Sequence, residues 1–384
     1  MPSETHPDFN PILSARLLAA ANEQDHATFQ ALLLRSDVDI NIVGPDSLNA
    51  FMISVVNGDH AGVTALAARG DLLINAKAEG GFSALMLASA LNEPDMVQTM
   101  LMREDLQIND ANDIGNTALM LGATRGHAQV VELFKSREDV DVNAANKHGG
   151  GTALILASIA GQPDTVECLN KFAGINLDAV DDMHCTALMH AVVHKHLPIV
   201  DSLKNCANIN ATNNLKWTAL MYAADTGDQP ILLSLLKVAR LDVNAVSEDE
   251  GKSALMIAAQ KGHDLLVKDL MDFGADIRLL AADGRTAQEM ARDACHTGLA
   301  DLLAAAQAHL AEHGDDAALS VAWTTLPATP SDEDDYLEVH QFISLDASND
   351  DRLLESAFAE QEEASPTDGS VESLNSDFTS LFLK

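Results

Sequence analysis

Aromatic residues are scarce in this chain of 384 residues: they make up 4% of it, with two Trp and two Tyr. The apolar share is nevertheless 47%, so the core has to be built from Ala, Leu, Val, Ile and Met. A chain of this length has ample material to bury such a core. Small and aliphatic side chains favour closely packed helices over a β-sandwich, whose core relies on larger residues.

Cysteine is scarce as well, and no two cysteines have the CxxC spacing of a metal or redox motif. We therefore expect free thiols that fill apolar space in a reducing compartment. The stretch MPSETHPDFNP contains neither the basic nor the apolar part of a secretory signal. No apolar run approaches the roughly 18 residues that span a bilayer. These absences predict a cytoplasmic protein without membrane insertion.

Basic residues are the third shortage, because 23 Lys and Arg face 58 Asp and Glu, a formal charge of −35. Such an acidic protein is poorly suited to contact the phosphates of nucleic acids or of an anionic membrane. The charge is compatible with a basic protein as partner.

What the chain has in abundance is one short phrase, which reads NAFM, SALM, TALM, TALI or TAQE. It begins at residues 49, 83, 117, 152, 186, 218, 253 and 286, and a degenerate copy, SARL, begins at residue 14. The steps between copies are 32 to 35 residues. A period this constant is the signature of a repeat array. It predicts nine units between about residues 10 and 309.

Each unit has the punctuation of two helices. The opening Ser, Thr or Asn predicts an N-cap, whose side-chain oxygen accepts a free backbone N–H; the residues are Ser14, Asn49, Ser83, Thr117, Thr152, Thr186, Thr218, Ser253 and Thr286. Glycines predict the end of the first helix at Gly58, Gly126, Gly161, Gly227 and Gly262. Prolines predict the first turn of the second helix at Pro94, Pro163, Pro198 and Pro230. A polar, extended loop then leads to the next cap.

The stretches GNTALMLGATRGHAQVVELF (115–134) and SALMIAAQKGHDLLVKDLMDFGADI (253–277) resemble the ankyrin repeat. That family has a period of about 33 residues and the pattern T-P-L-H-x-A. The resemblance covers roughly 300 residues and implies an all-α solenoid of about nine helix-turn-helix units with short hairpin loops. It also implies atypical end units that act as caps.

The chain departs from the family pattern in two ways. Ala replaces the Pro and Met replaces the His of T-P-L-H, which exchanges a hydrogen bond for an apolar contact. Asp stands where a Gly such as Gly274 would end the second helix, at Asp37, Asp71, Asp105 and Asp139. Because Asp tolerates the left-handed conformation better than most residues, we expect these aspartates to adopt it.

The stretch HCTALMHAVVHKH has the residue types of a zinc site, since imidazole and thiolate are zinc ligands. The repeat register gives these residues ordinary places instead. His184 and Cys185 fall at a hairpin tip, and His190 falls where other copies have Leu, Tyr or Ile. His194 ends the first helix, and His196 takes the structural His position. We therefore expect no metal site and no cofactor.

Ankyrin arrays bind proteins through their hairpin tips and through the first-helix ends that line a concave groove. The resemblance implies the same two strips here. On the hairpins we expect partner contacts, with accessible aromatic anchors, at Phe82, Asn116, Cys185, Trp217, Lys252 and Arg285. In the groove we expect them at Leu91, Arg125, Ile159, Val193, His194, Asp225 and Lys261.

The period ends near residue 309. Residues 310–384 contain 18 acidic and 2 basic residues, which leaves −19 of the total charge on the rest of the chain. We expect residues 1–9 to form an arm and residues 310–384 to form a largely disordered acidic tail with apolar islands that suit binding of a partner. The final residues, with Leu381, Phe382 and Leu383, resemble the C-terminal signals of type IV secretion effectors of intracellular bacteria. That resemblance implies a translocated effector acting in a host cytosol.

No catalytic motif emerges: the sequence has no Gly-rich phosphate loop after a strand, no G-x-S-x-G and no HExxH. We therefore predict a non-catalytic, monomeric scaffold or adaptor that binds a protein partner. Two alternatives remain open. One is an acidic inhibitor or mimic that binds basic proteins, and the other is a metal-dependent enzyme that uses the His/Cys cluster of residues 184–196.

Overall fold

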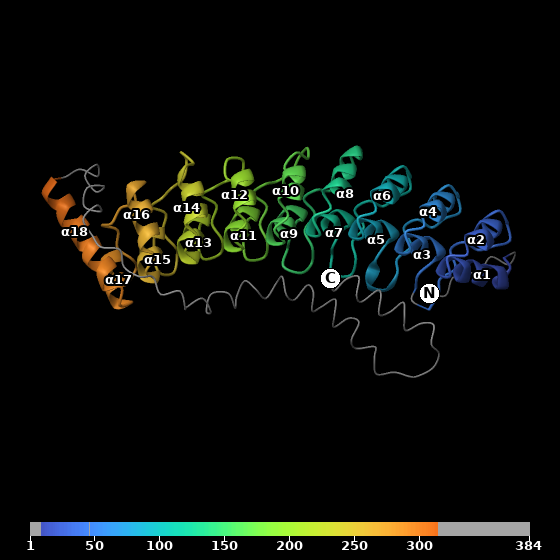
Figure 1. The fold of residues 1–384 in the computed structure, drawn as a ribbon, viewed down its shortest axis with the longest axis horizontal. Helices are drawn as coiled ribbons and strands as arrows, with labels where there is room; N and C mark the ends of the chain where they lie inside the picture. Colours follow the sequence, from blue (N-terminus) through green and yellow to red (C-terminus); the bar gives the residue numbers. More distant parts are fainter. Residues whose placement is uncertain (1–8, 46, 314–384) are drawn as a thin grey trace, which may run out of the picture. The chain divides into compact units, whose positions relative to one another are not determined.

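The computed structural model describes residues 9–45 and 47–313. Within those ranges the chain forms eighteen α-helices and two short 3₁₀ helices, and its only β-structure is a set of isolated bridges. Figure 1 shows the helices as nine consecutive pairs in two parallel rows, with odd-numbered helices in one row and α2 to α18 in the other. This confirms the predicted all-α repeat solenoid.

The first helices of the units are α1 (Pro11–Asn22), α3 (Ala50–Val56), α5 (Ala84–Ala90), α7 (Ala118–Thr124), α9 (Ala153–Ile159), α11 (Ala187–Val193), α13 (Ala219–Thr226), α15 (Ala254–Lys261) and α17 (Ala287–Asp293). The second helices are α2 (His26–Leu33), α4 (His60–Ala67), α6 (Pro94–Leu101), α8 (Ala128–Leu133), α10 (Pro163–Leu169), α12 (Leu197–Leu203), α14 (Gln229–Leu236), α16 (Asp264–Asp272) and α18 (Thr297–His313). The 3₁₀ helices are η1 (Glu79–Gly81) and η2 (Phe134–Ser136).

Eight of the nine predicted N-caps are confirmed. In α5, for example, the Ser83 hydroxyl accepts the backbone N–H of Met86 at 3.4 Å. The exception is Ser14, which lies inside α1 because Asn10 caps that helix instead. The Ser14 hydroxyl accepts the N–H of Asp39 at 2.9 Å, and so holds the following loop.

The predicted helix ends are confirmed too. The five glycines after the first helices all have φ between +68° and +78°. The same left-handed turn is made by Gln24, Asn92, Lys195 and Cys295 in units that have no glycine there. All four predicted prolines occupy the first or second position of a second helix.

The core runs through the first helices. Each first helix contacts the first helix of the next unit, and each second helix from α2 to α14 contacts the next second helix. A first helix such as α5 is therefore covered on both sides, and all seven of its residues are buried. Its alanines Ala84 and Ala88 are fully buried, and small side chains at such contacts permit close helix approach.

An asparagine ladder connects successive loops. Asn75 donates to Asp105 O at 2.6 Å and accepts from Gln107 N at 2.8 Å. The same pair of bonds is made by Asn41, Asn109, Asn143, Asn210 and Asn244. At the corresponding position of the sixth unit stands Asp178, which accepts from Asn208 N but has no N–H to donate.

The aspartates at the ends of the second helices contradict the expected left-handed conformation, since none of them has a positive φ. Each instead binds the arginine two residues before it, as Asp105 binds Arg103 at 2.7 Å. That guanidinium also donates to Ala67 O of the preceding unit at 2.8 Å, and it holds the pKa of the Asp105 carboxyl below its ordinary value. The arginine thus satisfies helix-end carbonyls that are otherwise left without donors.

Candidate functional site

The hairpins are the segments between the end of a second helix and the next N-cap. Isolated antiparallel bridges close six of them, as between Val180 and Thr186. Neighbouring hairpins are joined by backbone hydrogen bonds, for example from Asp182 N to Gly149 O at 2.8 Å. The hairpins therefore form a connected surface rather than separate projecting loops.

The residue before each N-cap does not have the accessible position expected from the sequence. Phe82 is 4% exposed, and Asn116, Cys185 and Lys252 are also buried. Trp217 and Arg285 are half-buried: Trp217 packs on the Tyr222 ring with centroids 5.2 Å apart, and Arg285 pairs with Asp283 and Asp293. The expectation of an exposed anchor at Phe82 is thus wrong, although whether any of these residues binds a partner is a separate matter.

Local backbone geometry explains this burial. The N-cap is extended, so the residue before it turns its side chain toward the helix that follows. At Gly151, a Cβ atom would lie 3.0 Å from Leu156 Cδ2, five residues later. The backbone N–H of the residue before the N-cap can also donate to a side chain at the start of the hairpin. In the sixth unit, Cys185 N donates to Asp181 Oδ1 at 2.8 Å.

Three positions of each unit consequently meet under the hairpin, and we call their row along the array the hairpin seam. It comprises the residue five or six before the cap, the residue just before it and the residue four after it. In the third unit the set is Ala78, Phe82 and Leu87, which are all apolar and buried. In the sixth unit it is Asp181, Cys185 and His190, and in the seventh it is Asn213, Trp217 and Tyr222.

The polar members of the seam bind one another. His190 Nε2 lies 2.7 Å from Asp181 Oδ2, and Asn213 Nδ2 donates to the Tyr222 hydroxyl at 2.7 Å. The two units meet at Cys185, whose Sγ lies 3.9 Å from that hydroxyl. Burial raises the pKa of Cys185 to about 11, with the Asp181 charge as the next cause. A thiol held in this way is not a nucleophile at neutral pH.

The four histidines of residues 184–196 do not form one metal site. His184 is exposed at a hairpin tip with φ of +59°, and His194 Nδ1 bonds to the carbonyl of His190 at 2.9 Å. His196 bonds to Ile159 O of the preceding unit at 3.3 Å, which is the structural role predicted for it. Of this cluster, Cys185 and His190 alone have possible ligand atoms close to one another, and Asp181 lies beside them.

The first-helix ends match the expected second strip in part. Leu91, Arg125, Ile159 and His194 are half-buried, but Val193 is buried, so its expected accessibility is wrong. Asp225 and Lys261 pair with each other across neighbouring units, with Oδ1 and Nζ 3.2 Å apart. The charges of these two groove residues therefore already bind one another.

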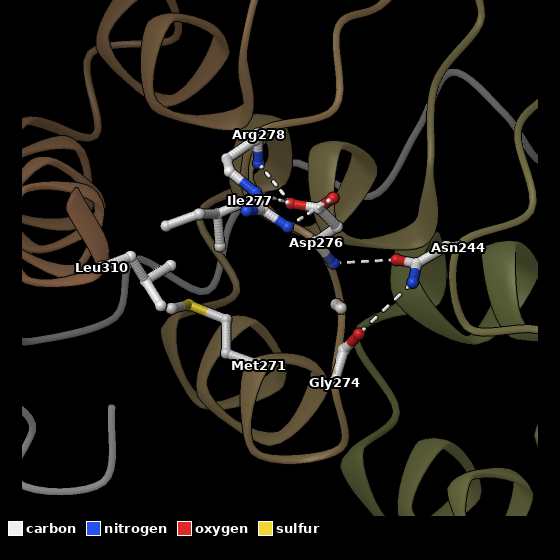
Figure 2. Close-up of a pocket in the computed structure, with 8 residues that line it drawn as sticks. Asn244, Met271, Gly274, Asp276, Ile277, Arg278 and Leu310 are labelled. Atoms are coloured by element: carbon white, nitrogen blue, oxygen red, sulfur yellow. Dashed lines mark hydrogen bonds and ion pairs between the residues drawn. The ribbon is translucent and has the colours of Figure 1, made fainter. Parts of the chain in front are cut away.

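A small pocket of about 160 Å³ lies beside the eighth unit (Figure 2). Asn244, Asp276 and Arg278 supply its polar groups, and Met271 and Leu310 lie at its apolar side. Figure 2 shows these polar groups already bonded: Asp276 binds Arg278 at 2.8 Å, and Asn244 belongs to the asparagine ladder. The pocket presents no catalytic arrangement.

Comparison with known families decides what these units are. A family described as "Ankyrin repeats (3 copies)" matches residues 17–112, 104–181 and 167–246, and "Ankyrin repeat" matches residues 250–282. The chain belongs to the ankyrin-repeat family. No curated protein matches it significantly. Ankyrin repeats are protein-interaction modules, so the coarse prediction of a protein-binding scaffold is supported. Separately, no helix within residues 9–45 and 47–313 is long and apolar enough to cross a membrane.

Sequence reasoning missed a group of exposed apolar residues of this ankyrin array. Five of them lie on four consecutive hairpins and are between 40% and 59% exposed: Val180, Met183, Leu215, Val246 and Leu280. We call this set the apolar hairpin strip. A signal for it was present, because Val180, Val246 and Leu280 share one register position, directly before the first residue of the seam. Side chains alternate along an extended hairpin strand, so that position faces solvent when its neighbour is buried.

Proposed function

We propose that this chain is a non-catalytic scaffold whose protein partner docks on the apolar hairpin strip. The observation that carries the proposal is the exposure of five aliphatic side chains on four consecutive hairpins. These hairpins are bonded in series, with Asn214 N donating to Met183 O at 3.2 Å and Glu248 N donating to Leu215 O at 3.1 Å. Apolar surface gathered on a preformed scaffold is typical of an interaction site.

The charge around the strip indicates the chemistry of the partner. The same hairpins expose Asp182, Glu248, Asp249 and Glu250. Two nearby cations are committed to acidic neighbours, since Lys252 pairs with Glu250 and Arg285 with Asp283. A partner that places apolar side chains between Lys and Arg residues complements this surface, and its association is accelerated by the opposite charge.

The first-helix ends supply the second contact in this proposal. Leu91, Arg125, Ile159 and His194 keep part of their surface exposed. Hairpins and first-helix ends lie on the same units, so one extended segment of a partner can reach both. An acidic inhibitor of basic proteins is the limiting case in which charge supplies most of the affinity.

The test compares protein capture from lysate by three full-length baits. The first is the unchanged chain, and the second carries Met183→Ser, Leu215→Ser and Leu280→Ser in the strip. The third is a control that carries Leu34→Ser, Met102→Ser and Leu265→Ser, which alter even more exposed residues, at 62% to 89%, on the second-helix side. Circular dichroism verifies that all three are folded.

We expect partners to be recovered with the control and reduced at least about 10-fold with the strip variant, a loss of about 1.4 kcal/mol or more. Repeating the capture in high salt separates the two forms of the proposal. Apolar docking leaves much of the recovery intact, whereas an acidic inhibitor loses it because exposed charges are screened. Equal recovery by all three baits would show that the strip is not the docking surface.

The effector reading adds delivery to this binding role. It is supported by the resemblance of the C-terminal sequence, including Leu381, Phe382 and Leu383, to secretion signals; these residues lie outside the described part of the chain. The test fuses a translocation reporter to the full chain and to a chain with all three residues changed to Ser. Delivery of the first alone into host cytosol supports the effector reading, and equal delivery of both or of neither contradicts it.

A further inference from the structure

The seam set of the sixth unit differs from the others in all three positions at once. In the third, fourth, fifth, seventh and eighth units, the members of the seam sets are glycine, aliphatic, aromatic, amide, hydroxyl or lysine residues, as in Asn112, Asn116 and Leu121 of the fourth unit. In the sixth unit they are Asp181, Cys185 and His190. A carboxylate, a thiol and an imidazole are the three side-chain types that bind zinc in proteins.

The three side chains are brought together in a buried space. Each is at most 9% exposed, and one ligand atom from each lies within 4.8 Å of those from the other two. Asp181 is held in place because its Oδ1 accepts the backbone N–H groups of Met183 at 2.9 Å and Cys185 at 2.8 Å. Its Oδ2 is left to face His190.

The surroundings suit a bound thiolate. Asn213 Nδ2 and the Tyr222 hydroxyl each lie 3.9 Å from Cys185 Sγ, from the next unit. A metal-bound sulfur accepts such polar contacts, and the outer groups orient the ligands.

The charges of the three side chains also match those of a divalent ion. A dication with one carboxylate, one thiolate and one neutral imidazole gives a neutral set.

We propose that Asp181, Cys185 and His190 form a structural site for zinc or a similar divalent metal between the sixth and seventh units. Ligand atoms of a tetrahedral zinc site lie about 3.3 Å apart, from metal–ligand distances of about 2.0–2.1 Å. Asp181 Oδ2 and His190 Nε2, at 2.7 Å, separate by a small side-chain rotation as the ion enters. Binding releases the thiol proton of Cys185, so the affinity rises with pH.

The chain itself supplies substitutions that preserve the fold. Asp181→Asn, Cys185→Asn and His190→Leu install the seam set of the fourth unit, which packs in this same array. The matched control is Cys206→Ser with Cys295→Ser, which removes the two exposed thiols. A second control changes His184 and His194 to Ala, which tests the histidines that the structure places elsewhere.

The experiment uses full-length protein that has been freed of metal under reducing conditions. Zinc is titrated against a chromophoric chelator, and Co²⁺ serves as a spectroscopic probe, because a thiolate–cobalt charge-transfer band reports Cys185 directly. We expect one metal per chain in the unchanged protein and both controls, a higher melting temperature with zinc, and affinity at least 10-fold weaker in the triple variant. Binding that persists in the triple variant, or is lost in the exposed-thiol control, overturns the proposal, as does the absence of stoichiometric binding to the unchanged chain.

Discussion

The glycines that end the first helices differ in how much room they have for a side chain. Gly58 and Gly161 have nearly the same backbone, with φ of +68° and +70°. A Cβ at Gly58 would meet nothing within 4 Å, whereas a Cβ at Gly161 would lie 2.6 Å from His196 Cε1 of the next unit. The same position of the repeat thus has room for a methyl group in one unit and not in another.

We predict that Gly161→Ala lowers the free energy of unfolding by more than Gly58→Ala does. Both variants bear about 1–2 kcal/mol for a left-handed non-glycine residue, and Gly161→Ala adds about 1–3 kcal/mol for the overpacked histidine contact. Urea unfolding followed by circular dichroism measures both. Equal losses would mean that the His196 ring moves aside without cost.

The structural histidines make stability depend on pH. Burial lowers the pKa of His127 and His263, which bond to Ala90 O at 3.1 Å and Asp225 O at 3.3 Å. A lowered folded-state pKa means that the unfolded chain binds the proton more readily. Their contribution is therefore complete above the ordinary pKa of about 6.5 and declines as the pH falls below it.

We predict that His127→Gln with His263→Gln reduces the loss of stability between pH 7 and pH 5. Glutamine is the residue of the fifth unit at this position, where Gln162 donates to Thr124 O at 3.4 Å, so the hydrogen bond is kept without the titration. The measurement is the midpoint of urea unfolding at several pH values. A variant that loses as much stability as the unchanged chain would place the pH dependence elsewhere.

At the scale of the element, the asparagine ladder has one weak step. Asp178 accepts from Asn208 N, but the pattern of its counterparts would also require a bond to the carbonyl of Cys206. A carboxylate has no hydrogen to donate. At this step the asparagine ladder therefore supplies one bond between successive loops, where it supplies two in the other units that carry Asn.

We predict that Asp178→Asn raises the free energy of unfolding by about 1 kcal/mol, the usual net value of one hydrogen bond. The reciprocal change, Asn109→Asp, removes the donor to Asp139 O at 2.6 Å and lowers stability by about 1–2 kcal/mol. Both are measured by chemical denaturation with urea. Opposite signs for the two variants are required, and a destabilising Asp178→Asn would contradict the ladder's role.

At the scale of the whole molecule, the charge is strongly one-sided. The formal charge is −35, and residues 1–309 carry −19 of it. Many acidic side chains of the described residues are paired with Arg or Lys, but acids outnumber bases. Unpaired like charges repel one another in the folded array and oppose folding.

We therefore predict that added salt stabilises the protein. Salt at about 0.5 M shortens the screening length to a few ångströms, which weakens the repulsion among all the acids. The readout is the melting temperature in low and high sodium chloride, with sucrose as a control for general solute effects. A melting temperature that falls with salt would mean that the Arg–Asp pairs contribute more than the repulsion.

Much of this fold could be predicted from the sequence because its signals are local. A cap such as Thr117 binds an N–H three residues away, and a glycine such as Gly126 ends a helix through its own φ. Such contacts need no knowledge of distant residues. The period, eight of the caps and the turns were therefore predicted correctly. The cap predicted at Ser14 was wrong because Asn10, four residues earlier, caps the same helix.

The site could be predicted far less well, because the role of a residue depends on which side chains meet it in the folded hairpins, both within its own unit and in the next one. Cys185 has a tip-like place in the repeat, yet it is buried beside Asp181 and against Tyr222 of the next unit. Asp105 has the place of a helix-ending glycine, yet the arginine two residues earlier makes it an ion-pair partner. The sequence by itself determined the nine-unit ankyrin array through local backbone chemistry. Only the tertiary structure decided which side chains of that array meet under the hairpins and which remain on its surface, because both depend on how the hairpin backbone turns and on how neighbouring units stack.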